Sequence, residues 1–179
     1  MICAGIDYSM NSPAVCIYKE DGILNPSNCS YHFFGLDKWR PRWSALQNVN
    51  CYKFPKDLKD LDKYMFLAEW TIETLRHYNY RASKVVLEDY SFGSTGRVFH
   101  IAENVGILKY TLKKNGLRYE IFSPTVLKKF ATGKGNSNKE AMLEAWKTEP
   151  DTFDLVQETG NPASDIVDSY FLCKYGVNQ

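Results

Sequence analysis

The sequence predicts an α/β protein in which a mixed five-stranded sheet is flanked by helices. Three stretches of strand character come first, and helical and strand patterns alternate after them. Because 179 residues is the length of one ordinary domain, we expect residues 1–179 to share a single core. A hydrophobic fraction of 44% and a charged fraction of 24% are typical of globular proteins, which excludes a chain that is disordered throughout.

The five expected strands are short apolar stretches bounded by turn or polar residues. They cover residues 2–6, 14–18, 29–34, 85–87 and 119–122. Glu20, Asp21 and Gly22 give a hairpin signal between the second and third strands. Residues 35–56 show no clear period, so we expect them to form a surface insertion.

Two long helices are predicted by apolar residues at alternating spacings of three and four, which place them on one helical stripe. The stripes are Leu58, Leu61, Met65, Ala68, Ile72 and Leu75 in the first helix, and Val98, Ile101, Val105, Leu108 and Leu112 in the second. Ser123 followed by Pro124 is typical of a helix start. Another helix is expected to start at Ser137 or Asn138, and a last one covers residues 161–176.

Charge and cysteine content exclude several classes of protein. The net charge of +1 excludes a uniformly basic protein that wraps nucleic acid. Residues 101–147 nevertheless carry nine Lys or Arg against four acids, and residues 148–179 carry one against six. No apolar run reaches the roughly 18 residues of a membrane span, and the first residues lack a signal peptide, so a cytoplasmic protein is expected. Five cysteines without CxxC spacing indicate reduced thiols.

Four carboxylates occupy positions at which they could meet. Asp7 ends the first expected strand, Glu88 ends the strand at 85–87, and neighbouring ends of parallel strands form one ligand-binding edge. Asp165 and Asp168 are three residues apart on the last helix and therefore share a face. If this helix docks beside the first strand, the four carboxylates converge.

Such a group of carboxylates indicates a metal site. Neighbouring carboxylates repel each other, which raises their pKa values and destabilises the fold unless cations offset the charge. Oxygen ligands favour Mg²⁺ or Mn²⁺, and two such ions about 4 Å apart can hydrolyse a phosphodiester. Taken singly, an Asp after a strand is usually a loop residue or a helix cap, and an Asp-x-x-Asp pair is usually solvated. Their order along the chain is what predicts a site.

The sequence also resembles a known family over nearly its whole length, residues 35–56 excepted. Four blocks carry the resemblance: residues 4–7 (Ala-Gly-Ile-Asp), residues 86–88 (Val-Leu-Glu), residues 123–128 with Gly133-Lys134-Gly135 and Lys139, and residues 161–168. In this order they resemble the RuvC family of Holliday-junction resolvases, within the RNase H-like superfamily. The resemblance implies an RNase H-like fold, a homodimer and branched DNA as the substrate, with no nucleotide cofactor.

The resemblance also implies roles for individual residues. Asp7, Glu88, Asp165 and Asp168 would be the catalytic ligands of two Mg²⁺ ions per active site, which Mn²⁺ is expected to replace. Lys128 and Lys139 would be catalytic residues near the scissile phosphate. Contacts to DNA would come from Tyr90, Phe92, Lys129, Gly133, Lys134 and Gly135, with one of the two aromatic residues stacking at the junction.

The resulting hypothesis is a Mg²⁺-dependent endonuclease that resolves four-way junctions by paired nicks. The helix at 98–112 is the expected dimer contact, provided that Phe99, Ala102 or Tyr110 is exposed. The alternatives are a related nuclease that cuts flaps, replication intermediates or RNA–DNA hybrids, a non-catalytic DNA-binding module, and an ATPase of the sugar-kinase or actin type. The ATPase needs two lobes, and this chain has the length of one.

The chain also departs from the family pattern. Tyr8-Ser9 follows Asp7 where the family often has Pro-Gly, and residues 35–56 have no family counterpart. These departures suggest a divergent, viral branch of the family, which would act in the host cytoplasm.

Overall fold

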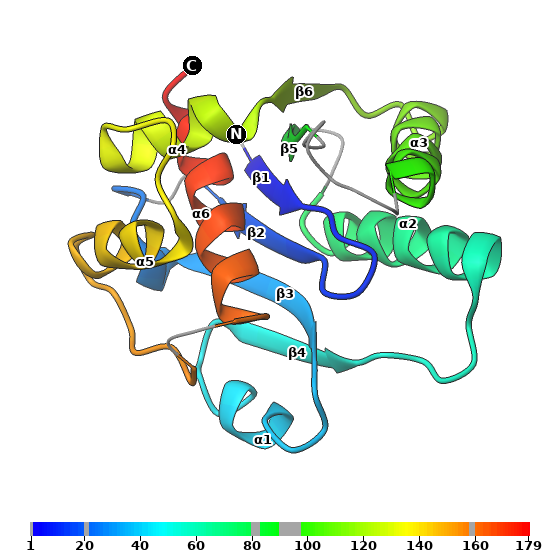
Figure 1. Cartoon of the computed structure of the whole chain (residues 1–179), viewed down its shortest axis with the longest axis horizontal. Helices are drawn as coiled ribbons and strands as arrows, with labels where there is room; N and C mark the ends of the chain where they lie inside the picture. The colour runs from blue at the N-terminus through cyan, green and yellow to red at the C-terminus, as the bar shows by residue number, and fades with distance from the viewer. Residues whose placement is uncertain (1, 20–21, 80–82, 90–97, 158–159) are drawn as a thin grey trace.

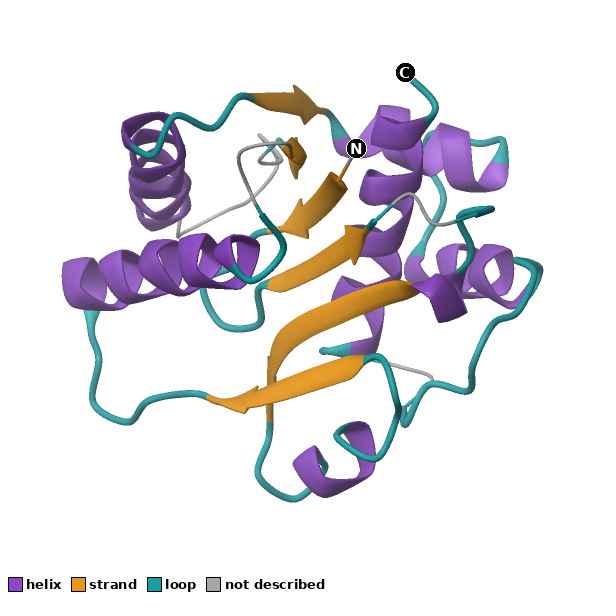
Figure 2. Cartoon of the chain, turned by 180° about the vertical axis from the view of Figure 1, so that it is seen from behind, coloured by secondary structure: helices purple, strands orange, loops and turns teal. Residues whose placement is uncertain are grey.

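A computed structural model describes residues 2–19, 22–79, 83–89, 98–157 and 160–179. The strands are β1 (Ile2–Asp7), β2 (Ala14–Tyr18), β3 (Cys29–Gly35), β4 (Val49–Lys53), β5 (Ser83–Glu88) and β6 (Tyr119–Phe122). The helices are the 3-10 turn η1 (Pro26–Asn28), α1 (Arg40–Trp43), α2 (Asp60–Arg76), α3 (Val98–Lys114), α4 (Pro124–Thr132), α5 (Lys139–Lys147) and α6 (Ala163–Val177). Figure 1 and Figure 2 show helices on both faces of the sheet, which confirms the predicted α/β class.

The sheet has the strand order β4-β3-β2-β1-β5-β6. Strand β2 is antiparallel to β1 and β3, whereas the other neighbouring pairs are parallel. Five strands therefore run in one direction, and their carboxyl ends lie along one edge of the sheet. Because this edge includes the ends of β1 and β5, the topology sets where a ligand-binding site can form.

The sheet has six strands rather than the five that the sequence predicts, because residues 35–56 are not a simple surface insertion. Within them, β4 pairs in parallel with β3. The indole of Trp43 in α1 is fully buried and meets Phe33 edge-on, with ring centroids 5.2 Å apart. Helix α1 has only four residues and β4 has only one buried residue, so neither leaves a periodic signal in the sequence.

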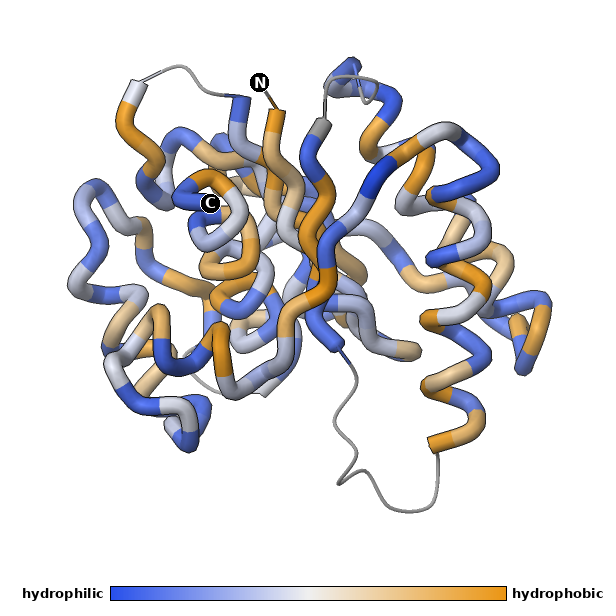
Figure 3. The backbone as a smooth tube through the Cα atoms, turned by 90° about the horizontal axis from the view of Figure 1, so that it is seen from above, coloured by the Kyte–Doolittle hydropathy of each residue, from blue (hydrophilic) through white to orange (hydrophobic). Residues whose placement is uncertain are grey.

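Side chains along the central strands point alternately to the two faces of the sheet, so each face has its own part of the hydrophobic core. Cys3 and Val86 point toward α6, whereas Ala4, Ile6 and Val85 point toward α2 and α3. Figure 3 shows that the central strands are largely hydrophobic, as strands covered on both faces should be. Asp7 and Glu88 continue the alternation on the side of α6.

The helices agree with the sequence except in the first half of α2 and at the start of α3. Leu61 and Met65 of the predicted stripe are 58% and 46% exposed, since Tyr64 and Leu67 turn to the sheet instead. Helix α3 buries its predicted stripe from Val105 onward. No helix among the described residues combines the length and the apolar character needed to cross a membrane.

The helix starts and the cysteines follow the predictions. Ser123 caps α4, and Asn138 rather than Ser137 caps α5 through a hydrogen bond that its Oδ1 accepts from the Ala141 amide at 3.0 Å. All five cysteines are free thiols, and all but Cys51 are buried. The hairpin signal at Glu20 and Asp21 lies outside the described residues.

Candidate active site

The register of the central strands brings Asp7 and Glu88 together. Strands β1 and β5 are parallel, and Ile6 lies opposite Leu87, so the next residue of each strand is an acid. Both carboxylates emerge at the carboxyl edge of the sheet and on the face that α6 covers. The first two acids of the predicted set are therefore neighbours because of backbone pairing alone.

Helix α6 brings the other two acids to the same place, and Gly5 allows the close approach. A Cβ atom on Gly5 would lie 2.2 Å from both the Ser169 carbonyl oxygen and the Cys173 amide nitrogen, so the α6 backbone lies directly on β1. Asp168 directly precedes Ser169 on the same helix, and Asp165 lies about one turn before it. The condition that α6 docks beside the first strand is therefore met.

The four carboxyl groups, which we call the acidic cluster (Asp7, Glu88, Asp165 and Asp168), interact with one another. Burial and then the carboxylates of the other three raise the pKa of Asp7 well above its usual range. Asp7 lowers the pKa of Asp165, whereas the Asp165 carboxylate raises that of Asp7, so the two groups favour opposite protonation states. The acids thus share one poorly solvated place in which they cannot all be ionised without a cation.

The other members of the acidic cluster show the same cause. Burial, followed by the Asp168 carboxylate, raises the pKa of Glu88 to about 7. Burial raises the pKa of Asp165 to about 7 and that of Asp168 to about 6. These values lie close to neutral pH, so the cluster holds protons that a divalent cation could displace.

Lys128 and Lys139 are the cations of the site. The half-buried Lys128, on α4, lowers the pKa of Glu88 and of Asp168 through its charge. Lys139, at the start of α5, does the same for Asp7, Asp165 and Asp168. The two lysines that the resemblance indicates therefore flank the acidic cluster from different helices.

Three polar residues that the sequence did not indicate connect the loops around the site. The Asn161 amide donates to Ser12 Oγ at 2.6 Å, and Ser12 in turn lowers the pKa of the Asp165 carboxyl group. Ser164 Oγ donates to Asn161 Oδ1 at 2.8 Å and accepts from Lys139 Nζ at 3.2 Å. Asn161 and Ser164 belong to the block at residues 161–168, which indicated no role for them, whereas Ser12 lies in none of the four blocks.

The acidic cluster offers oxygen ligands of the kind that hard divalent cations prefer. Asp165 Oδ2 is buried, and no described group hydrogen-bonds to it. Such an orphaned acceptor beside three other carboxyl groups is a donor set suited to Mg²⁺ or Mn²⁺. No three acidic, histidine or cysteine side chains among the described residues are already arranged around one point as a closed metal cage. Mg²⁺ sites commonly use one or two carboxylates and complete the shell with water and substrate phosphates.

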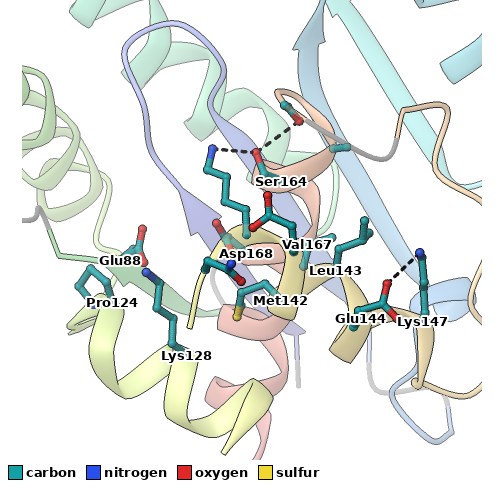
Figure 4. Close-up of a pocket in the computed structure, with 15 residues that line it drawn as sticks. Glu88, Pro124, Lys128, Met142, Leu143, Glu144, Lys147, Ser164, Val167 and Asp168 are labelled. Atoms are coloured by element: carbon teal, nitrogen blue, oxygen red, sulfur yellow. Dashed lines mark hydrogen bonds and ion pairs between the residues drawn. The ribbon is translucent and has the colours of Figure 1, made fainter. Parts of the chain in front are cut away.

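A cavity of about 410 Å³ opens beside the acidic cluster. Figure 4 shows Glu88 and Lys128 at one end of it and Glu144 and Lys147 at the other, with Asp168 between them. The cavity lies between α4, α5 and α6. The charged groups that could act on a phosphodiester therefore border a space that can take part of a substrate.

The remaining predicted residues fall into three groups. Lys129 and Lys134 are exposed on and after α4, and their contacts to DNA stay predictions. Gly133 has a φ of 79° as the left-handed cap of α4, and a Cβ on Gly135 would meet Thr125 Cγ2 at 2.6 Å. These local requirements explain both glycines without DNA. Tyr90 and Phe92 lie outside the described residues.

Comparisons with known proteins give structural matches. No protein-family model and no curated protein matches the sequence. The structure of Thermus thermophilus RuvC superposes with a TM-score of 0.62 at 13% identity, over 97% of this chain and 91% of that chain. The T. thermophilus RuvC in complex with Holliday junction substrate gives 0.60 at 12% identity, over 97% and 90%. The chain therefore has the RuvC fold, a mixed sheet flanked by helices.

Proposed function

We propose that the protein is a Mg²⁺-dependent endonuclease that cuts branched DNA, with the four-way junction as its substrate. The observation that carries the proposal is the convergence of four carboxyl groups and two lysines at one sheet edge. A phosphodiesterase needs carboxylates for metal ions beside cations for phosphate. The fold shared with RuvC, one structure of which holds a Holliday junction substrate, supports branched DNA over other phosphodiesters.

The residues have separate tasks in this mechanism. The acidic cluster would hold two Mg²⁺ ions, which when bound supply an activated water and stabilise the leaving oxygen. Lys128 and Lys139 would orient the scissile phosphate and offset the negative charge that develops on it. Ser164 would keep Lys139 in place through its hydrogen bond, and Ser12 would favour the ionised form of Asp165 by lowering its pKa. The products are a 5′-phosphate and a 3′-hydroxyl.

A homodimer would provide the two active sites that paired nicks require. The outer face of α2 and α3 carries large exposed side chains, among them Phe99 at 85% and Tyr110 at 66%. Leu61 and Met65 extend this face and line a groove with Tyr110. An exposed apolar patch of this kind is typical of an interface. A second copy related by two-fold symmetry would match the symmetry of a four-way junction.

Cleavage of a synthetic four-way junction by the wild-type protein and by Asp7→Asn tests the proposal. With Mg²⁺ the wild type should make symmetric nicks, and Asp7→Asn should be slower by about 100-fold or more, while it still shifts the junction in a gel. Asp62→Asn is the matched control, because Asp62 is exposed on α2. Full cleavage by Asp7→Asn would refute the assigned role.

The same assay separates the closest alternative. A flap and an RNA–DNA hybrid of matched sequence are cut in parallel with the junction. Because the acidic cluster alone does not distinguish these substrates, faster cleavage of a flap or a hybrid would overturn the junction as substrate and leave the nuclease chemistry intact.

A further inference from the structure

We propose that the cavity between α4, α5 and α6 receives a single nucleobase, unstacked from the nucleotide next to the scissile phosphate. The inference rests on the proposed function and adds to it a base-binding site. The cavity has a volume of about 410 Å³. This is within the range of about 300–1,000 Å³ that small-molecule sites occupy, and it is too small for a duplex.

The walls of the cavity suit an aromatic ring. Met142 and Val167 are buried, and Leu143 and Pro124 are half-buried, so the lining presents hydrocarbon and a thioether from three helices. Apolar walls with a few polar groups are typical of sites that bind a flat organic ligand. A phosphate or a metal ion alone would have no use for this part of the lining.

The polar groups divide into two sets at the two ends. Glu88, Lys128 and Asp168 border the cavity at the proposed reaction site, as Figure 4 shows. At the other end Lys147 Nζ donates to Glu144 Oε1 at 3.0 Å, and this pair can exchange hydrogen bonds with the edge of a base. A nucleotide has the same order of groups, with an anionic phosphate at one end and a flat base at the other.

The position of the cavity, rather than its shape, identifies the ligand that it would bind. Glu88, Asp168, Lys128 and Lys139 line both this cavity and the proposed reaction site, so a ligand inside is continuous with the bound phosphate. Lys139, which also lines the cavity, reaches across to Ser164 on α6. The nucleotide attached to the scissile phosphate is the part of the substrate that can reach the cavity.

Branched DNA reduces the cost of presenting such a base. Taking a base out of a duplex stack costs a few kcal/mol, and the cost is least where pairing is already absent or disturbed. The exchange point of a junction is such a place. The cavity would therefore favour cleavage near the branch point and would give the enzyme a preference for the base that fits.

The test places 2-aminopurine, a base whose fluorescence rises when it unstacks, at each position around the cleavage point of a junction. The experiment uses the Asp7→Asn variant, so that a change in fluorescence reports binding to an uncleaved junction. We expect a rise at one position next to the scissile phosphate. Leu143→Trp in the same background should abolish the rise by filling the cavity, whereas Ile121→Trp on the edge strand β6 should not.

Cleavage kinetics provide the second measurement. With Asp7 intact, Leu143→Trp should slow junction cleavage by about tenfold or more, the size of effect that apolar pocket contacts have on specificity, and an abasic site at the responsive position should do the same. Cleavage without a fluorescence rise at any position overturns the base-binding site and leaves the nuclease. A rise without cleavage by the wild type overturns the nuclease and keeps the site. A third outcome would assign the cavity to a soluble nucleotide instead of a base of the junction. In that outcome no position shows a fluorescence rise, and a free mononucleotide stabilises the protein with Leu143 but not Leu143→Trp.

Discussion

Replacing Glu88 by Gln should stabilise the metal-free protein at pH 8 and have little effect at pH 5. Burial and the neighbouring Asp168 carboxylate raise the pKa of Glu88 from 4.5 to about 7. The folded state therefore holds this proton in a pH range where the unfolded chain has lost it. Because the pKa is raised on folding, the free energy of unfolding falls as the pH rises from about 4.5 through 7.

The size of the effect follows from the pKa difference. One pKa unit corresponds to about 1.4 kcal/mol, so ionisation of Glu88 in the folded state costs about 3 kcal/mol. This is an upper value, since members of the acidic cluster share the same interactions. For a domain of this length, 1 kcal/mol moves the melting temperature by about 2–4 °C, so the variant should melt up to about 6–12 °C higher than the wild type at pH 8.

Urea unfolding of the wild type and Glu88→Gln in EDTA, at pH 5 and pH 8, measures this difference. His32 titrates with the opposite sign, because burial lowers its pKa to about 4, but it is present in both proteins and cancels. Glu69→Gln, on the exposed face of α2, controls for the change of side chain. A variant that is equally or less stable than the wild type at both pH values would refute the buried, mutually repelling cluster.

Magnesium should narrow the difference in stability between the two proteins. An ion that binds only the folded state stabilises it by about 2.7 kcal/mol at 100 times its dissociation constant. The wild type should gain this stabilisation at pH 8, and Glu88→Gln should gain less because it lacks one ligand. Equal gains for the two proteins would remove Glu88 from the proposed metal ligands.

Three further perturbations test separate parts of the structure. Gly5→Ala places a Cβ atom 2.2 Å from α6 backbone atoms that have no flexible end to move, so urea unfolding should show a loss of about 3 kcal/mol or more, and junction cleavage should fall with it. Trp43→Ala should cost about 3–5 kcal/mol in the same unfolding measurement if residues 35–56 belong to the core, and less than 1 kcal/mol if they are a surface insertion. Phe99→Glu should halve the mass observed by sedimentation at micromolar concentration and uncouple the paired nicks, and an unchanged dimer would exclude this face as the interface.

The sequence predicted those parts of the fold that have a period or a cap. The stripe from Val105 to Leu112, the cap at Ser123 and the short strand ending at Glu88 each leave a local pattern, and each is found in the structure. Strand β4 and Trp43 were missed because residues 35–56 show no period, and both are stabilised by partners distant in the sequence. Leu61 and Met65 were misplaced because spacing cannot tell which of two possible stripes on one helix will meet the sheet.

The parts of the candidate site that could be predicted are likewise those with a local pattern in the sequence. Strand ends and an Asp-x-x-Asp pair can be located in sequence, so the acidic cluster could be anticipated once α6 was assumed to dock on β1. Ser12 could not, since its role depends on the Asn161 amide 149 positions away. Lys128 and Lys139 were predictable in part. Their positions agree with a family pattern, but their effect on the carboxylates depends on how α4 and α5 pack against α6.

The contact between Gly5 and α6 links stability to activity in this fold. Bringing Asp165 and Asp168 against Asp7 is electrostatically unfavourable, so another part of the same helix must hold it in place. That part is the segment that buries Tyr170, Phe171 and Leu172 in the core and lies on Gly5 at Ser169 and Cys173. Because β1 and α6 come from opposite ends of the chain, the site is complete only when these ends have met. A substitution that loosens the apolar part of α6 should therefore reduce metal affinity before it unfolds the sheet, because mutual repulsion will separate the carboxylates as soon as the packing allows it.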